Sequence, residues 1–394
     1  MTTTRAMRRM TDPPGDHPTN PPAAPPGAAP PGAAPPGAAP PGAAPPGAAP
    51  PGAAPPRDPP TGPSADLSAG AEPRTRTGAV RPTSTVPAGT GVLRAAAVIA
   101  TVPYLVLKGA WLAGSRIGIP DGSVLLEPGP LPAVANAVTM AMDACVIVLA
   151  LLLTRPWGRR VPGPLLIVPV YTATGLLTPI LTGFPGQLVV RALGLGAGDA
   201  VKAARGPFLD DWVYPVVYGG FIVQGLALAG LFVPYARERW GRCWQGPPGT
   251  RLPSPTGVVA GAAATVGAAA GAIHLYWAFG GAAWLSARQV AQYSAESGVI
   301  SAVHGLCALA AGAGALLLAR GGGVRVRWPL ALAWIGSSAS LGWGLWLLTA
   351  VLGLEFGDPE RLSPMIYLAY AGQVIVGGLC AVVLARFTRS RLAA

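Results

Sequence analysis

Charged residues and cysteines are scarce in this sequence. Asp, Glu, Lys and Arg make up only 11% of the 394 residues, whereas an ordinary soluble domain contains about 25%. The four cysteines form neither a CxxC pair nor a spaced framework, which excludes a disulfide scaffold and a zinc ribbon. Walker loops, flavin motifs and nucleophile–base pairs are also missing. The sequence therefore gives no support to covalent or redox catalysis, and it predicts no cofactor.

The net charge of +12 does not indicate a nucleic-acid-binding protein. Such a protein needs basic residues gathered on one face and interleaved with aromatic side chains. Here the arginines stand at the ends of apolar runs, as the signals of membrane topology do. We therefore expect no nucleic-acid partner.

Long apolar runs, by contrast, are abundant in the sequence. The mean hydropathy is +0.46 and 51% of the residues are hydrophobic. Runs of about 20 apolar residues cross a hydrocarbon core of about 30 Å as helices. They must be helical because lipid offers no partner to free backbone N–H and C=O groups. The sequence predicts an all-α, polytopic membrane protein with the lipid bilayer as its partner.

The N-terminal 88 residues form a separate region of different composition. Residues 25–54 are six consecutive copies of PPGAA, and the five-residue period excludes collagen. A segment of this kind has nothing to bury, so we expect a disordered cytoplasmic tail. Both a solvated spacer and a docking site for a proline-recognising partner are consistent with it.

Eight spans can be placed by hydropathy. We predict them at 92–113, 133–154, 164–184, 213–235, 257–280, 299–319, 329–353 and 364–386. Segments 155–163, 236–257, 319–329 and 386–394 hold 13 Arg and a single acid, whereas the alternate loops hold six basic and nine acidic residues. By the positive-inside rule the arginine-rich side is cytoplasmic, together with both termini. Within the long loop 185–212, residues 188–195 are apolar enough to form a short interfacial helix.

The spans also predict a tandem duplication. KGAWLAG (108–114) matches HLYWAFG (274–280), and residues 151–165 match 316–330 without a gap at an offset of 165. The last spans match as well, over 211–224 and 360–373. Four spans per unit insert in the same direction, so a pseudo-twofold axis along the membrane normal is expected.

The duplication predicts the organisation of the chain. It places a first four-helix repeat at 89–240, a cytoplasmic linker at 241–256 and a second four-helix repeat at 257–394. IHLYWAFGG (273–281) and the span after it resemble a family of uncharacterised bacterial four-span membrane proteins, whose first span ends in His-x-Tyr-Trp-Ala-x-Gly-Gly. This resemblance covers about 257–390, and the first half departs from it at Lys108, Leu112 and Ala113. It supports the fold and the duplication and implies a bacterial cytoplasmic membrane, but it implies no reaction.

Four ionisable residues lie at membrane depth, where they are costly and indicate functional sites. Lys108, His274 and His304 share a layer near the outer face, and Asp143 lies somewhat deeper. Each has a structural alternative: Lys108 can snorkel to the headgroups, and either histidine can make a bond between helices. Asp143 must be protonated, paired or in a wet cavity, and a pair with Lys108 would neutralise both charges.

Further candidates accompany these four. Trp111 and Trp277 occupy equivalent places in the duplicated motif, and Gln224 and Gln373 are duplicated near mid-membrane, where they either bond neighbouring helices or line a cavity. A metal site of His274, His304 and Cys307 is a weak alternative, because the first half carries Thr139 and Met142 at the corresponding positions.

Three functions are consistent with these patterns. The leading prediction is the binding or movement of a small apolar or amphipathic molecule between the two repeats, with the four ionisable residues around one shared cavity. The first alternative is a membrane enzyme acting on a lipid or isoprenoid, with His274, His304 or Asp143 as general acid or base. It predicts an apolar pocket lined by Tyr276, Trp277 and Trp343. The second is a non-catalytic subunit whose polar residues pair inside the bundle.

Overall fold

A computed structural model describes residues 88–393, except 127–129, 247–248, 250–251 and 355–362. The PPGAA repeats, and with them nearly all of the tail predicted to be disordered, lie outside these ranges. All described helices belong to one unit, residues 79–394. Eight of them are long and apolar enough to cross a membrane, so the prediction of an all-α, multi-pass membrane protein with eight spans is confirmed. They are α1 (Ala88–Leu112), α2 (Pro130–Thr154), α3 (Gly163–Ala192), α5 (Val213–Arg239), α6 (Thr256–Ala278), α8 (Ala295–Arg320), α9 (Arg327–Leu354) and α10 (Pro364–Ala393).

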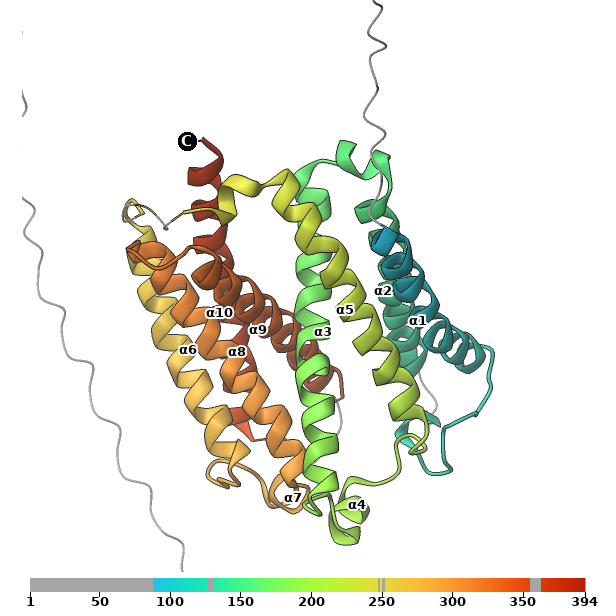
Figure 1. The fold of residues 1–394 in the computed structure, drawn as a ribbon. Coiled ribbons are helices and arrows are strands. Elements are labelled where there is room, and N and C mark those ends of the chain that lie inside the picture. Colours follow the sequence, from blue (N-terminus) through green and yellow to red (C-terminus); the bar gives the residue numbers. More distant parts are fainter. Residues whose placement is uncertain (1–87, 127–129, 247–248, 250–251, 355–362, 394) are drawn as a thin grey trace, which may run out of the picture. The chain divides into compact units, whose positions relative to one another are not determined.

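Short elements cap the two ends of this unit. The 3-10 turns η2 (Pro156–Arg160) and η3 (Gly241–Trp244) lie at the same end as the C-terminus, at the top of Figure 1. The short helices α4 (Asp199–Arg205) and α7 (Ala287–Ala291) lie at the opposite end. A third turn, η1 (Val124–Leu126), precedes α2. The two ends are called the arginine-rich end and the acidic end below, after the loops that they carry.

Helix α3 is longer than its sequence predicts. It runs to Ala192, so the expected short helix at 188–195 is wrong, and most of those residues continue the span. Pro169, Pro179 and Pro185 stand inside it, and each removes one i→i−4 hydrogen bond. Packing against neighbouring helices keeps the helix continuous through these positions.

The second half is a closely packed four-helix bundle. Helix α8 packs against both α6 and α9, and α10 closes the bundle by packing against the same two helices. The contact faces of α8 carry Ala308, Ala311 and Ala315, all fully buried. These small side chains let the neighbouring backbones approach closely, which is how helices associate in lipid.

Gly336 on α9 tests this close packing. A Cβ atom built on Gly336 would lie 2.4 Å from the backbone nitrogen of Ala311 and 2.7 Å from the carbonyl oxygen of Cys307. Gly336→Ala should force α8 and α9 apart and lower the free energy of unfolding by about 1–3 kcal/mol. Gly378→Ala is the matched control, since a Cβ at this helical glycine would meet nothing within 4 Å. Melting of both variants in one detergent checks the prediction, and equal melting temperatures would contradict it.

The first half is packed differently. Helix α1 packs against α2 and α5, but α2 makes few contacts with α3, which instead packs mainly against α8 and α9. At the offset of 165, α2 carries Asp143, Val146 and Leu149 where α8 carries the smaller Ala308, Ala311 and Gly314. The larger side chains on α2 coincide with the sparse contact between α2 and α3, and the smaller ones on α8 with its close packing against α9.

Hydrogen bonds hold α3 against the second half. The Tyr171 hydroxyl donates to Ser337 Oγ (2.7 Å), and Trp343 Nε1 of α9 donates to the carbonyl oxygen of Leu176 (3.0 Å). At the acidic end, Arg191 Nε donates to Glu296 Oε1 (3.0 Å). Helix α3 therefore belongs to the first half by sequence and to the second half by most of its contacts.

Candidate functional site

A pocket of about 590 Å³ opens where α2 and α3 are separated. We call it the Lys108 pocket. Its non-aromatic polar lining residues come from α1, α2, α3 and α5 and are Lys108, Asn136, Thr139, Asp143, Thr172 and Gln224. Its aromatic lining residues include Tyr104, Trp111, Tyr218 and Phe221 from the first half and Trp343 and Trp346 from α9 of the second. The pocket is therefore completed by both halves of the chain.

Lys108 is held in the pocket by neutral partners. Its Nζ donates to Asn136 Oδ1 (2.7 Å) and lies 4.8 Å from the ring centre of Trp111 and 5.1 Å from that of Tyr104. The ring faces attract the ammonium group without neutralising it. Among the described residues no carboxylate forms an ion pair with Lys108. Its positive charge is therefore available to an anionic group that enters the pocket.

Asp143 lies deeper in the same pocket. Its side chain is 4% exposed, and neither carboxylate oxygen accepts a hydrogen bond. The predicted pair with Lys108 is not formed. Lys108 is bonded to Asn136, and Asp143 lies seven residues further along α2, a rise of about 10 Å.

Gln224 of α5 is the polar neighbour of Asp143. Its Nε2 donates to the carbonyl oxygen of Ala100 on α1 (3.2 Å), and its Oε1 lacks a partner. Buried polar atoms are nearly always paired, so these three acceptor oxygens, which have almost no accessible surface and no donor, are an unusual feature of the pocket wall. From the sequence, Gln224 is expected either to bond a neighbouring helix or to line a cavity. In the structure it does both.

The two membrane histidines lie together in the second half. The His274 and His304 ring centres are 5.7 Å apart, and the side chains are 3% and 5% exposed. Gln373 Nε2 lies 2.7 Å from His274 Nε2, so an amide N–H donates to the ring nitrogen and His274 Nδ1 carries the hydrogen. This Nδ1 and Gln373 Oε1 have no partner. The Trp277 and Tyr370 rings pack against the His274 ring at 5.5 and 6.4 Å.

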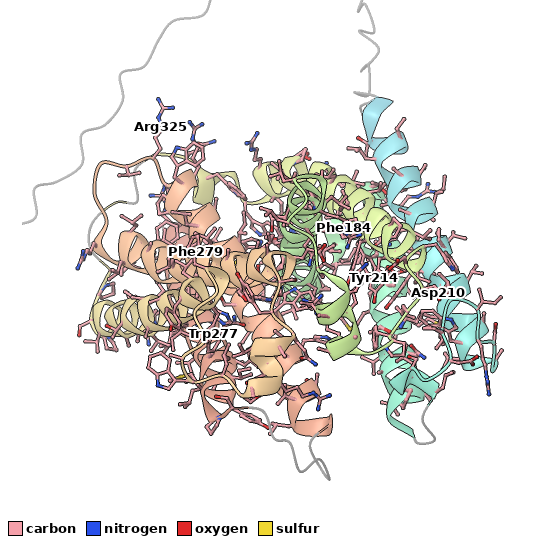
Figure 2. The ribbon with its side chains drawn as sticks, turned by 90° about the horizontal axis from the view of Figure 1, so that it is seen from below. Phe184, Asp210, Tyr214, Trp277, Phe279 and Arg325 are labelled. Carbon is pink, nitrogen blue, oxygen red and sulfur yellow. The ribbon has the colours of Figure 1, made fainter. Side chains whose placement is uncertain are left out.

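The structure divides the eight predicted residues into two groups of four. Lys108, Trp111, Asp143 and Gln224 line the pocket, whereas His274, His304, Trp277 and Gln373 are buried in the second bundle and line neither pocket described here. Figure 2 shows Tyr214 of the pocket wall and Trp277 among different helices. The four ionisable residues expected around one shared cavity therefore do not line a common pocket among those described here.

Trp343 lies at the border between these two groups. It lines the Lys108 pocket, and its ring centre is 5.8 Å from that of His304. Of the three aromatic residues expected to line one apolar pocket, only Trp343 does so. Tyr276 and Trp277 pack near the end of α6, where Trp277 Nε1 donates to the carbonyl oxygen of Ala283 (3.4 Å).

The weak metal alternative gains no support from the geometry. Within the described ranges, no three His, Cys, Asp or Glu side chains are grouped so that they could hold a metal ion. His274 and His304 are neighbours, but Cys307 does not complete a set of ligands with them.

Asn136 is the pocket residue that the sequence reasoning missed. Asn136 is a neutral amide near the start of a span, and it lacks the charge that makes Lys108 and Asp143 conspicuous in an apolar run. The spacing carries a signal, since Asn136, Thr139 and Asp143 recur at three and four residues and so share one face of a helix.

Fold and site together define a multi-pass membrane protein with a mainly apolar pocket, containing a few polar side chains, at the junction of its two halves. No family model, curated protein or solved structure matches this chain. Its function is therefore argued from the pocket.

Proposed function

We propose that the protein binds a small amphipathic molecule with an anionic head in the Lys108 pocket. One observation carries this proposal. The ammonium group of Lys108 lies in a pocket walled mainly by aromatic and aliphatic side chains, and no carboxylate among the described residues forms an ion pair with it. A volume of about 590 Å³ is within the range of small-molecule sites, which run from about 300 to 1,000 Å³.

The chemistry of the walls describes the ligand. A carboxylate or phosphate group would pair with Lys108, and an apolar body would pack against Phe221, Trp343 and Trp346. A hydroxyl or amide N–H further along the molecule would donate to Asp143 or Gln224, whose oxygens lack donors.

The position of the pocket supports a site between two repeats. Trp343 and Trp346 of α9 complete a wall that otherwise comes from the first half. The order of packing supports the duplication, because the first helix of each half packs against the second and the fourth. In this proposal the arginine-rich end faces the cytoplasm of a bacterium, and the Lys108 end of the pocket lies toward the outer face.

A photoreactive fatty acid tests the proposal. The probe is a long-chain carboxylic acid with a diazirine in its chain, added to the purified protein in nanodiscs and mapped by peptide mass spectrometry. We expect adducts on pocket-lining segments of α2, α5 or α9. Because hydrogen bonds to charged groups contribute about 1.5–3 kcal/mol, Lys108→Gln should lower the labelling about tenfold or more.

Two controls make the result specific. Lys202→Gln removes the only other lysine, which is exposed on α4, and should leave labelling unchanged. The amine with the same chain should label less than the acid. Equal labelling of Lys108→Gln and the wild type would overturn the proposal. So would preferential labelling by the amine that is lost in Asp143→Asn, since this would indicate a cationic ligand.

The two alternatives fit less of the geometry. A general acid or base must reach its substrate, and His274 and His304 line neither pocket, so Asp143 is the one acid–base candidate of the enzyme alternative that lines a pocket described here. The pairing of His274 with Gln373 favours a structural role for the second bundle, as a non-catalytic subunit would have. It leaves the open Lys108 pocket unexplained.

A further inference from the structure

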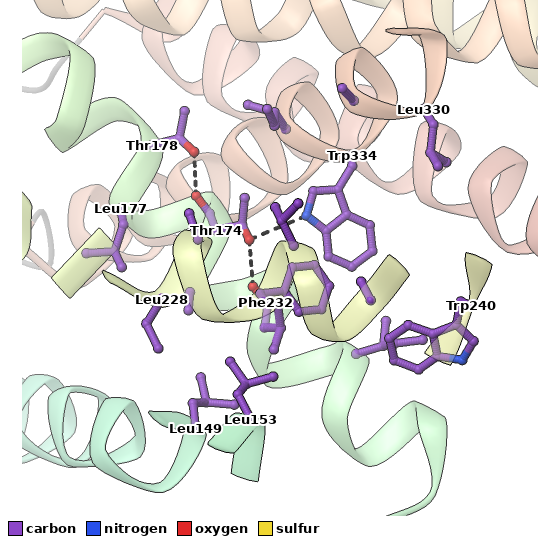
Figure 3. Close-up of a pocket in the computed structure, with 18 of the residues that line it drawn as sticks. Leu149, Leu153, Thr174, Leu177, Thr178, Leu228, Phe232, Trp240, Leu330 and Trp334 are labelled. Atoms are coloured by element: carbon purple, nitrogen blue, oxygen red, sulfur yellow. Dashed lines mark hydrogen bonds between the residues drawn. The ribbon is translucent and has the colours of Figure 1, made fainter. Parts of the chain in front are cut away.

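A second pocket, of about 440 Å³, lies on another face of α3. We call it the Trp334 pocket. Its walls are mainly α3, α5 and α9, as Figure 3 shows for Leu177, Leu228 and Trp334. Near the arginine-rich end it is completed by η3 and the last turns of α10. It shares Leu149 of α2 and Ala173 and Leu177 of α3 with the Lys108 pocket, so the two pockets meet along these two helices.

The threonine hydroxyl groups in its wall are already engaged. Thr174 and Thr178 donate their hydroxyl groups to carbonyl oxygens of α3 (2.8 and 2.7 Å), and Trp334 Nε1 lies 3.4 Å from Thr174 Oγ1 (Figure 3). The remaining wall is largely leucine, alanine and aromatic rings. This pocket therefore offers space and apolar contact to an occupant, and almost no hydrogen bonds.

The pocket is long and reaches one end of the spans. On α3 its lining extends from Ile167 to Leu181, a rise of about 21 Å, which exceeds the depth of one leaflet in a hydrocarbon core of about 30 Å. At the arginine-rich end the lining includes Trp240, Trp244 and Leu392. An occupant can therefore begin at headgroup level and extend to the middle of the bilayer.

Arginines flank that end of the pocket. Arg242 stands in the chain between the lining residues Trp240 and Cys243, and Arg389 and Arg391 stand between the lining residues Thr388 and Leu392. None of these three arginines forms an ion pair with a carboxylate in the part of the chain that the structure describes.

The charge of Arg391 lies close to Cys243, which lines the Trp334 pocket. Burial raises the pKa of the Cys243 thiol, and the positive charge of Arg391 acts in the opposite direction. Arg391 also donates to the carbonyl oxygen of Gln245, just after η3. Its guanidinium group is therefore held beside the opening.

We infer that the Trp334 pocket holds one acyl chain of an anionic phospholipid from the leaflet at the arginine-rich end. In a bilayer an acyl chain gains no hydrophobic energy by leaving other lipids for an apolar pocket. Selection of the occupant must then come from its headgroup, and an anionic phosphate complements Arg242, Arg389 and Arg391. A chain placed here would also fill the space between α3, α5 and α9.

Native mass spectrometry of the protein released from vesicles tests this inference. The vesicles contain equal amounts of phosphatidylglycerol and phosphatidylcholine with the same chains, and the retained lipids are counted. We expect the wild type to retain phosphatidylglycerol preferentially. Arg242→Gln combined with Arg389→Gln should lower that retention on the order of tenfold. Arg391 is left unchanged because of its bond to Gln245.

Two matched variants separate a built site from general attraction. Arg320→Gln with Arg325→Gln removes two exposed arginines of the same end that stand outside the pocket, and it should leave the retained lipid unchanged. Ala229→Phe, whose wild-type side chain lines the pocket, should abolish retention, whereas Ala95→Phe on α1 should not. Equal loss in both arginine variants, equal retention of the two lipids, or full retention in a folded Ala229→Phe variant would each overturn the inference.

Discussion

A cysteine in place of Lys108 will react with a membrane-impermeant thiol reagent about 100-fold faster, or more, than a cysteine in place of His274 or His304. Lys108 is half-buried at the wall of the pocket, whereas the two histidines are 3% and 5% exposed inside the second bundle. A buried thiol reacts only when the bundle opens locally, and an opening free energy of about 2.7 kcal/mol already slows the reaction 100-fold. Rates measured in protein freed of its four native cysteines check this expectation.

The background and a reference position matter for this measurement. Cys145 must be removed with the others, since it is exposed and lines the Lys108 pocket. A cysteine in place of the exposed Lys202 sets the rate of an open position. Similar rates at 108, 274 and 304 would mean that water reaches the histidines, and one shared cavity would return as the better description.

Gln373→Leu will lower the free energy of unfolding by about 1–3 kcal/mol, because it leaves the buried His274 ring without a partner. Gln224→Leu is the matched comparison and should cost less. The Gln224 amide donates to a backbone oxygen at 3.2 Å and lies at a pocket wall, whereas the contact between Gln373 and His274 measures 2.7 Å inside a closed bundle. Melting temperatures of the two variants in the same detergent make the comparison.

A double-mutant cycle identifies the contact responsible. His274→Leu together with Gln373→Leu should cost less than the sum of the single changes, because neither polar group is then left alone. Costs that add within about 0.5 kcal/mol would show that the two side chains do not stabilise one another in the folded protein.

The number of spans can be predicted from the sequence, because each segment that crosses the bilayer must be apolar and must satisfy its own backbone hydrogen bonds as a helix. The end of α3 does not follow in the same way. The predicted span ends at residue 184, yet the helix continues through Pro185 to Ala192, because packing on α8 and α9 outweighs the lost hydrogen bonds. The duplication and the resemblance of the second half to a four-span family stay predictions.

The site divides in the same way between what the sequence reveals and what it leaves open. Lys108 and Asp143 stand out because charges at membrane depth are rare. Which of the polar residues share a pocket depends on how closely helices approach one another, and that depends on side-chain size at positions such as Ala308 and Gly314. The distance between two helices depends on the side chains of both. The sequence alone does not say which residues of the two helices face each other, so this distance could not be predicted from it.

Helix α3 belongs to the first half by sequence but packs mainly against the second half. The boundary between the two packed groups of helices therefore differs from the boundary between the two halves of the sequence. Counted by sequence, the membrane part divides into four helices and four. Counted by contacts, α1, α2 and α5 form one group, and α3 joins α6, α8, α9 and α10 in the other. A motion that widens the Lys108 pocket would move the three-helix group as a rigid body against the five, with α3 staying on the side of the larger group.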